Sequence, residues 1–584
     1  MIVFGEHETT IDTREALAVM RRRGAALDGA STGEWRDALV DFGELESAIL
    51  DGRRSPRDDE DELSRALADV SLALAAGFYD AVTGQRSPAG VNAIEALLDR
   101  VEGAAVPRAV RLRTAEAYAH RAVYPEMYIQ AASDFALTVR PARVLCVGLR
   151  TIGTSASAVV AAALSAHGVQ VDRVTVRPRG HAHDRRLALT ERLEAHLNEA
   201  SGAAIGAIVG EGDGLGPAFT AAARALGDMG VPDDRIVLFP SRPAEPRLAL
   251  EAASSRHRRY LVSFDSLFVR TGRLAQILGA PRLLDLSAGR WRRLFFTEDE
   301  APATHPLHER RKYLFHASGA RRPRLLARFA GLGRTGRARY DRALRLAASG
   351  WGPAPVGLRD GFLVLPFVEG RPLAANVAGP PLLDAMVRYL TRVRRGFAAP
   401  RTFSVDALLH MIDINAAEAG LAPGREAMRR VAAAASESAL VEAVGVDGRM
   451  LPHEWLATAS GFAKVDALDH HDDVFFPGTC DPAWDLAGAL VELEWPNGGG
   501  AALLAAYARS TNDRGLETRL PFQLAAYLAF RLGYCRRAAA ALEGTADGAR
   551  FAALARRYRT ALAARLDARV SAPHVDTRGA RTVP

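Results

Sequence analysis

The feature that most constrains the fold is an alternation of apolar runs and helical stretches. Four apolar runs of strand length are separated by three stretches with helical character; the runs are 143–149, 169–176, 204–210 and 235–241. Strands that are apolar along their whole length and alternate with helices are typical of a parallel sheet covered on both faces. The sequence therefore predicts an α/β fold class, with a parallel-sheet domain around these residues.

The length and the local patterns predict more than one domain. A chain of 584 residues has room for two to four domains. Helical spacing before the first apolar run predicts a helical cap on the sheet, and later strand-like runs followed by a long helical region predict a second α+β domain. The predicted boundaries are a polar N-terminal segment (1–60), the capped sheet domain (61–290), the second domain (291–570) and a loose tail (571–584).

Charge and cysteine usage restrict the class of partner and the compartment. The formal net charge is +7, and Lys312 and Lys464 are the only lysines, so almost all of the positive charge is arginine. Arginine offers a planar fork that suits phosphates, which favours anionic small ligands. Basic runs interleaved with aromatic residues are lacking, so nucleic acid is less favoured. Three scattered cysteines and the lack of an uncharged apolar run of about 18 residues predict a cytoplasmic protein without a membrane segment. The oligomeric state stays open.

Polar and glycine-rich loops follow three of the predicted strands. The carboxyl ends of parallel strands form one edge of a sheet, where ligands bind. An anion-type loop, a basic loop and an acidic glycine loop at that edge point to a magnesium-bridged diphosphate sugar. The predicted phosphate- and pyrophosphate-binding residues are Arg150, Thr151, Gly153, Thr154, Arg177, Glu211, Asp213 and Gly214.

These three loops resemble the type I phosphoribosyltransferase fold. GLRTIGTS resembles its pyrophosphate loop, RPRGHAHDRR its flexible basic hood, and GEGDGLGPAF its ribose-phosphate loop. The third loop departs from the family pattern, because it lacks hydroxyl donors and contains Pro217. The resemblance implies phosphoribosyl pyrophosphate as a ligand.

A second group of chemical residues lies between Gly461 and Glu492, where acids crowd around Lys464. Asp466 follows the strand-like stretch FAKV, which places it well to hold a magnesium ion, and Asp473 is a second candidate ligand. Asp481 and Pro482 then begin a helix, as capping preferences favour. A solvated acidic loop is the alternative interpretation of this stretch.

The same region resembles the aminoglycoside phosphotransferase and choline kinase-like fold over about 295–565. DPAWDLA matches a family signature, and FVEGRPL resembles the hinge between the two lobes. The resemblance implies a two-lobed kinase-like domain with ATP and Mg²⁺ as cofactors. It assigns metal binding to Asp466, a brace of the catalytic loop to Asp485, and nucleotide binding to Arg328, Val368, Glu369 and Gly370.

The catalytic loop of that family departs most from the pattern. The family has His-Gly-Asp followed by asparagine, whereas this chain offers His453 at the start of the expected loop and Glu454 in place of the base. The predicted catalytic residues are therefore Glu454, His453 and Asp466.

Three functions remain open from the sequence. The first is a two-module transferase acting on a small phosphorylated or nucleoside-like metabolite. The second is a non-catalytic nucleotide sensor or scaffold with two degenerate sites. The third is an RNA-modifying enzyme, which the arginine excess favours. Whether the chain is an enzyme is left undecided.

Overall fold

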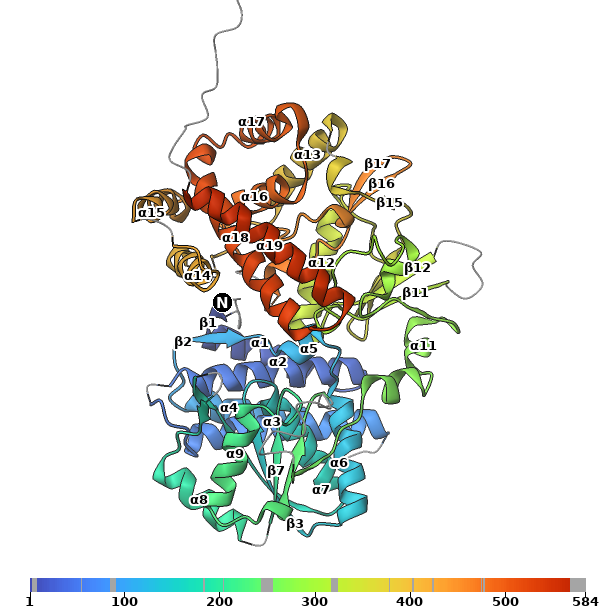
Figure 1. Ribbon diagram of the computed structural model, residues 1–584. Helices are drawn as coiled ribbons and strands as arrows, with labels where there is room; N and C mark the ends of the chain where they lie inside the picture. The colour runs from blue at the N-terminus through green and yellow to red at the C-terminus, as the bar shows by residue number, and fades with distance from the viewer. Residues whose placement is uncertain are drawn as a thin grey trace, which may run out of the picture.

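The computed structural model describes most of the chain, and the N-terminal and C-terminal halves lie one above the other (Figure 1). The described residues are 1–2, 8–53, 55–84, 91–181, 184–202, 204–242, 256–316, 324–377, 379–401, 404–422, 425–473, 475 and 478–567. The predicted loose tail, 571–584, falls outside them.

The N-terminal half contains the predicted parallel sheet. Its strands run in the order β4-β3-β7-β8-β9, and every neighbouring pair is parallel. The strands are β3 (Arg143–Leu149), β4 (Gln170–Val176), β7 (Ile205–Val209), β8 (Ile236–Phe239) and β9 (Arg258–Arg259). The accompanying helices are α6 (Pro125–Val139), α7 (Ile152–Ala166), α8 (Glu191–Ser201) and α9 (Pro217–Asp228), and a hairpin of β5 (Arg179–His181) and β6 (Asp184–Arg186) follows β4. The prediction from the apolar runs is confirmed for these strands.

The first 60 residues are folded into this half, contrary to the prediction of a polar segment. They form β1 (Glu8–Asp12), α1 (Thr13–Ala25) and α2 (Thr32–Asp51), followed by α3 (Glu62–Thr83), α4 (Val91–Gly103), β2 (Ala109–Arg113) and α5 (Glu116–His120). A capping box of Ser31 and Glu34 begins α2. Most of α2 is buried, and a Cβ on Gly43 would come within 2.7 Å of the Ser155 Cβ. The charged residues of α2 contact specific partners in the folded protein. The average polarity of the segment does not reveal these partners.

α3 is long and apolar enough to cross a membrane by length and composition, and half of that stretch is buried inside the protein. It packs against α2, α4 and α7. With this burial and these contacts, α3 is a core helix of the N-terminal half.

The C-terminal half begins with an antiparallel sheet in the order β10-β11-β12-β14-β13. Its strands are β10 (Leu284–Asp285), β11 (Lys312–His316), β12 (Arg324–Phe329), β13 (Gly357–Arg359) and β14 (Phe362–Pro366); α11 (Arg273–Leu278) precedes them and α12 (Gly333–Ala347) lies between β12 and β13. A small sheet of β15 (Arg371–Pro372), β16 (Trp455–Thr458) and β17 (Gly461–Lys464) follows.

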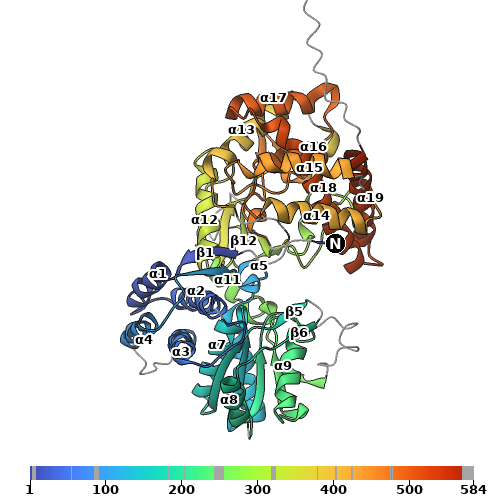
Figure 2. The ribbon, with the colours of Figure 1, turned by 90° about the vertical axis from the view of Figure 1, so that its left-hand side faces the viewer.

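A helical lobe completes the C-terminal half (Figure 2). It consists of α13 (Pro380–Gly396), α14 (Val405–Glu418), α15 (Arg425–Ala439), α16 (Ala483–Glu492), α17 (Gly499–Thr511), α18 (Leu516–Ala541) and α19 (Ala546–Asp567). α18 is its central element, packed against α14, α15, α16 and α19. A strand-rich lobe followed by a helical lobe is the arrangement expected for the second domain.

The two halves share one apolar core and a row of ion pairs, so the predicted boundary at residue 290 does not separate independent cores. The ring of Tyr124, the N-cap residue of α6, lies 5.9 Å from the Phe329 ring of β12, and both belong to one continuous buried cluster. On the surface of that contact, α2 presents acids to the first turn of α12. Asp37 accepts a hydrogen bond from Gly333 N (3.0 Å), and Asp41 accepts one from Arg334 N (2.8 Å).

Candidate functional site

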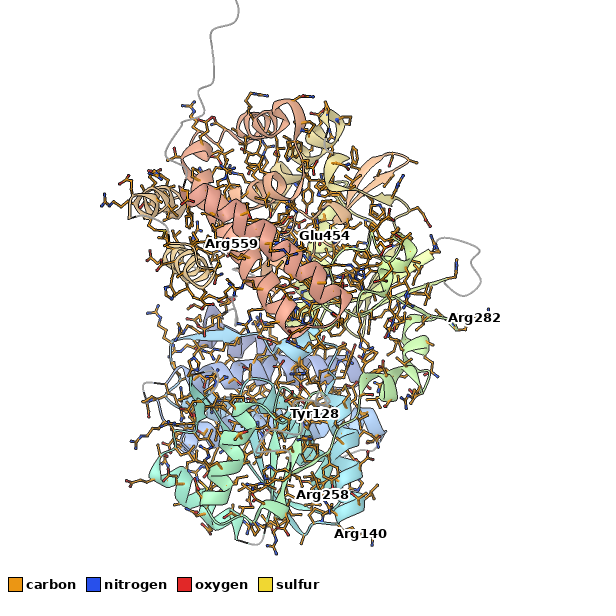
Figure 3. The ribbon with its side chains drawn as sticks, in the orientation of Figure 1. Tyr128, Arg140, Arg258, Arg282, Glu454 and Arg559 are labelled. Atoms are coloured by element: carbon orange, nitrogen blue, oxygen red, sulfur yellow. The ribbon has the colours of Figure 1, made fainter. Side chains whose placement is uncertain are left out.

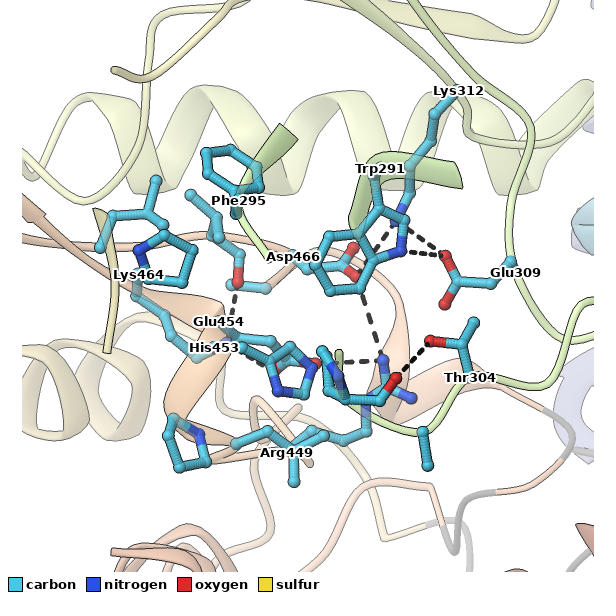
Figure 4. A pocket seen from close by; sticks show the side chains of 18 of the residues that line it. Trp291, Phe295, Thr304, Glu309, Lys312, Arg449, His453, Glu454, Lys464 and Asp466 are labelled. Atoms are coloured by element: carbon cyan, nitrogen blue, oxygen red, sulfur yellow. Dashed lines mark hydrogen bonds and ion pairs between the residues drawn. The ribbon is translucent and has the colours of Figure 1, made fainter. Parts of the chain in front are cut away.

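A cavity of about 650 Å³ lies in the C-terminal half, between the antiparallel sheet and the helical lobe. Its lining includes an apolar group, called the apolar end, that consists of Leu326, Leu365, Phe367, Val368 and Leu456; Leu326 and Leu365 are partners in the register of β12 and β14. The other end holds charged side chains from β11, β12, β17 and the loop before β16 (Figure 4). Figure 3 places Glu454, at the charged end, in the same half as α18 and α19.

Two cations from neighbouring strands meet at Asp466. Lys312 of β11 lies directly opposite Arg328 of β12 in the antiparallel register, so both side chains leave the same face of the sheet. Arg328 Nη2 is 2.7 Å from Asp466 Oδ1, and Lys312 Nζ is 3.5 Å from Asp466 Oδ2. Burial disfavours the charged carboxylate, but Arg328 and then Lys312 outweigh it and hold the pKa of Asp466 well below its usual range.

Lys464 is fully buried between two acids. Its Nζ lies 3.1 Å from Asp447 Oδ2 and 3.1 Å from Glu454 Oε2. Burial favours the neutral amine, but the charges of Asp447 and Glu454 prevail and raise the pKa of Lys464.

The loop before Glu454 is fixed by the predicted brace. Asp485, in the first turn of α16, accepts hydrogen bonds from the backbone N of Asp447 (2.8 Å) and of Gly448 (2.9 Å). The braced segment is therefore Asp447-Gly448-Arg449, six residues earlier than the start predicted at His453. This corrects the position of the catalytic loop.

The spacing between Arg449 and Glu454 can be compared with that of kinase catalytic loops. In kinase catalytic loops the aspartate precedes a metal-binding asparagine by five residues, with four residues between them. Here Arg449 precedes Glu454 by that spacing. Glu454 is 3 % exposed and lines the cavity.

His453 also lines the cavity, as a neutral ring stacked on tryptophan. Its ring lies 5.6 Å from the Trp291 ring at an interplanar angle of 24°. Burial lowers the pKa of His453 to about 4, so the imidazole is uncharged at pH 7. The geometry makes it part of an aromatic wall.

The residues do not fit a magnesium site. Two groups of side chains, Asp447/Glu454/His470 and Asp466/Asp469/His470, bring their ligand atoms within 4.8 Å of one another. Every acid in these groups already forms an ion pair with lysine or arginine. Asp473, predicted as a second metal ligand, belongs to neither group within the described residues. Instead it pairs with Arg310 at 2.7 Å.

The predicted nucleotide-binding linker joins β14 to β15. Val368 lines the apolar end of the cavity. Glu369 points to solvent and accepts a hydrogen bond from Arg324 Nε (3.1 Å). A Cβ on Gly370 would lie 2.9 Å from the Ala457 carbonyl oxygen, so glycine permits the linker to pack on β16. Arg328 lines the charged end of the cavity, where phosphates were expected.

In the N-terminal half, the predicted phosphate-binding arginines are neutralised by the chain itself. Arg150 Nε lies 3.1 Å from Asp51, and Arg177 Nε lies 2.8 Å from Asp51. Asp58 accepts a hydrogen bond from Arg177 N (2.6 Å) and pairs with Arg150. Both acids come from the stretch before α3 that was expected to be a polar segment and linker.

The other predicted residues at this edge have structural contacts. A Cβ on Gly153 would lie 2.5 Å from the Val209 carbonyl oxygen, so this glycine lets α7 approach the sheet. The remaining contacts are Thr154 with Ser47 (2.7 Å), Thr151 with Arg177 (3.5 Å), Glu211 with Arg121 (4.0 Å), Asp213 with Arg242 (3.2 Å) and Gly214 beneath Arg259. The arrangement shows how the edge is filled by the protein's own side chains.

Sequence reasoning missed Lys312, Arg449, Asp447 and Asp469 as members of the charged cluster. The register of the predicted β11–β12 pair would have placed Lys312 beside Arg328. The five-residue spacing before Glu454 would have singled out Arg449.

Among the comparisons with known proteins, only the comparison with solved structures gives matches, and these are distant. No family model matches the chain, and no curated protein matches it. Solved structures that match include a choline kinase, LicA, from Streptococcus pneumoniae (13 % identity, 51 % of this chain and 98 % of that one, TM-score 0.34). They also include a macrolide 2'-phosphotransferase, MphH, from Brachybacterium faecium (17 %, 51 % and 97 %, 0.30) and an ethanolamine kinase from Plasmodium vivax (9 %, 55 % and 92 %, 0.33).

These matches are kinases and phosphotransferases and cover about half of the chain. They give no support to a phosphoribosyltransferase domain. Since their TM-scores are below 0.5, the functional argument rests on the residues of this chain.

Proposed function

We propose that the cavity of the C-terminal half binds an ATP-like nucleotide and that the chain is a nucleotide-sensing or scaffold protein. The observation that carries this proposal is that apolar side chains and cations line the same cavity: Leu326, which pairs with Leu365, lies two residues from Arg328 on β12. A nucleoside triphosphate has the same division, with a planar base at one end and phosphates at the other. The cavity volume lies within the range of about 300–1,000 Å³ that is usual for small-molecule sites.

The residue at the base position favours binding without turnover. A kinase aspartate accepts the proton of the acceptor hydroxyl. The guanidinium of Arg449 has five N–H donors and no acceptor, so it cannot take that proton. Glu454 is engaged by Lys464 and Arg449, each at 3.1 Å.

Phosphoryl transfer to a small molecule is the second candidate function. It is favoured by the lining of the cavity, which includes Trp291, His453 and Tyr534 besides the residues assigned to the nucleotide. These side chains would contact the acceptor. Positioning and charge neutralisation supply most of the catalysis in phosphoryl transfer, so a missing base does not by itself exclude the reaction.

Thermal unfolding with and without ATP tests the binding proposal. A ligand that binds only the folded protein stabilises it by about 2.7 kcal/mol at 100 times its Kd. We expect ATP to raise the Tm of the wild type and of Arg388→Gln, an exposed residue of α13. Val368→Trp fills the apolar end and should abolish the shift, while its circular dichroism stays that of the wild type. No shift in the wild type would refute nucleotide binding.

An assay of ADP formation separates the two functions. Incubation with ATP and a pool of small hydroxyl compounds should give no ADP above the protein-free blank if the chain is a sensor. Formation of ADP that Val368→Trp abolishes would establish the phosphotransferase instead.

A further inference from the structure

We propose that the nucleotide phosphates bind in this cavity without a divalent metal ion, directly on Arg328, Lys312 and Arg449. Arg449 takes the place that a metal ion has in a working kinase. This inference rests on the proposed nucleotide binding and adds the ionic form of the ligand: the free polyphosphate anion rather than its magnesium complex.

The first observation is the position of the Arg449 side chain. One nitrogen, Nη2, lies 3.1 Å from Glu454 Oε1 and 4.0 Å from Asp466 Oδ2. In kinases the residues at these two positions hold the metal ions that bridge the phosphates. A guanidinium that faces both side chains supplies the positive charge that the metal would bring.

The second observation is that both carboxylates already have several cationic partners. Glu454 also contacts Lys464, and Asp466 also contacts Arg328 and Lys312. A magnesium ion needs near-octahedral oxygen ligands and would add two positive charges beside these four cations. It would have to displace Arg449 and Arg328 from their acids before it could bind.

The third observation is the presence of donors with no acceptor. Nε and Nη1 of Arg328, and Nε of Arg449, are buried and have no hydrogen-bond partner among the described residues. Arg328 is 5 % exposed and lines the cavity. A buried N–H without an acceptor is costly, and phosphate oxygens are the acceptors that arginine pairs with best. Two side chains that line the cavity, Arg328 and Arg449, therefore carry N–H groups for which the described residues supply no acceptor.

The arginines at this end of the cavity keep their charge although they are buried. This distinguishes the charged end from a solvated cluster of ion pairs. Burial lowers the pKa of Arg449, but Glu454 and Asp466 more than compensate and raise it, so the guanidinium keeps its charge. Arg328 likewise stays charged, because Asp466 and Asp469 outweigh the effect of burial on its pKa. Two permanent cations with spare donors can therefore face phosphates directly.

Isothermal titration calorimetry with ATP in EDTA and in excess MgCl₂ tests the inference on the whole chain. We expect the wild type to bind ATP in EDTA with a Kd that is at least as low as in magnesium. Arg449→Gln should weaken binding in EDTA by about tenfold or more, the effect of losing one charged contact. Arg388→Gln should leave it unchanged.

A second titration, with MnCl₂ alone, keeps the test independent of the nucleotide. The wild type should take up no Mn²⁺ at the cavity, whereas Arg449→Gln frees Glu454 and Asp466 and should bind it. If the wild type binds ATP only with magnesium, or binds Mn²⁺ as well as the variant does, the inference is wrong and nucleotide binding stands. If ATP gives no heat in either buffer, the proposed function itself is wrong.

Discussion

The ion pairs of Lys464 allow a stability prediction in which the magnitude follows from the structure. Lys464→Met keeps most of the side-chain volume but removes the charge between Asp447 and Glu454, each 3.1 Å from Nζ. Breaking a buried ion pair by removing one partner costs about 3–5 kcal/mol. Since Glu454 retains Arg449, and Asp447 retains the hydroxyl of Tyr389, we expect the lower end, about 3 kcal/mol.

The pH dependence of this loss has a defined sign. Burial raises the pKa of Asp447, but Lys464 and His470 lower it to about 2. In the wild type the carboxylate therefore contributes stability above its unfolded pKa and loses it only as the pH falls toward 2. Without Lys464 the pKa of Asp447 rises. The destabilisation should thus be full at pH 7 and should shrink as the pH falls toward 4 and the acid is protonated.

Urea unfolding followed by circular dichroism measures the effect, in a cycle with Asp447→Asn. The double variant Lys464→Met/Asp447→Asn removes both charges, so it should be more stable than the sum of the two single effects predicts. A coupling energy of at least about 1 kcal/mol is expected for such a contact. Arg388→Met, on the exposed face of α13, is the control and should change stability by less than about 0.5 kcal/mol. Additivity of the two single effects would refute the reasoning.

Three further predictions concern other parts of the molecule. Asp41→Ala should destabilise the contact between the halves by about 1–3 kcal/mol, because it leaves donors of α12 unpaired, whereas Asp28→Ala, at an exposed position, should not; Tm shows the difference. Burial, and then the charge of Asp447, raise the pKa of Asp485 to about 7, so its contribution is present at low pH and is lost as the pH rises through 7. The Tm of the wild type should therefore gain more than that of Asp485→Asn between pH 8 and pH 6. An amine-reactive label should modify Lys312, at 13 % side-chain exposure, before the fully buried Lys464, and ATP should protect it; equal labelling by mass spectrometry would contradict the site geometry.

The strands of both halves could be predicted because they depend on local pattern. Apolar runs such as 143–149 and 204–210 are buried on both faces, and the burial is visible in the composition of the run itself. α2 could not be predicted in the same way. Its charged residues, among them Asp37, Asp41 and Glu44, have partners about 290 residues away, in α12, and no local pattern contains that information.

The candidate site also contains some residues that local motifs predict and others that they do not. The brace Asp485 and the cavity residue Asp466 follow from short motifs whose geometry is local. Arg150 and Arg177 have the residue type and loop position of phosphate ligands, yet the acids that neutralise them come from the end of α2 and the loop after it. An arginine at a strand end indicates an anion, and only the tertiary structure shows whether that anion is a ligand or a carboxylate of the same chain.

The contacts of α12 connect the N-terminal half to the charged end of the cavity. Arg339 is fully buried; it donates to the Ala119 carbonyl oxygen of α5 at 2.7 Å and pairs with Asp472 at 2.9 Å. Asp472 lies in the segment that also supplies Asp466 and Asp469, so one side chain contacts both halves.

α12 is held in place by contacts from the N-terminal half. Here α2 fixes the first turn of α12, and α5 fixes Arg339. Asp469, which pairs with Arg328 and Arg310, is held in the same network. Through α12, the N-terminal half therefore contacts the segment that carries Asp466, Asp469 and Asp472 beside the cavity.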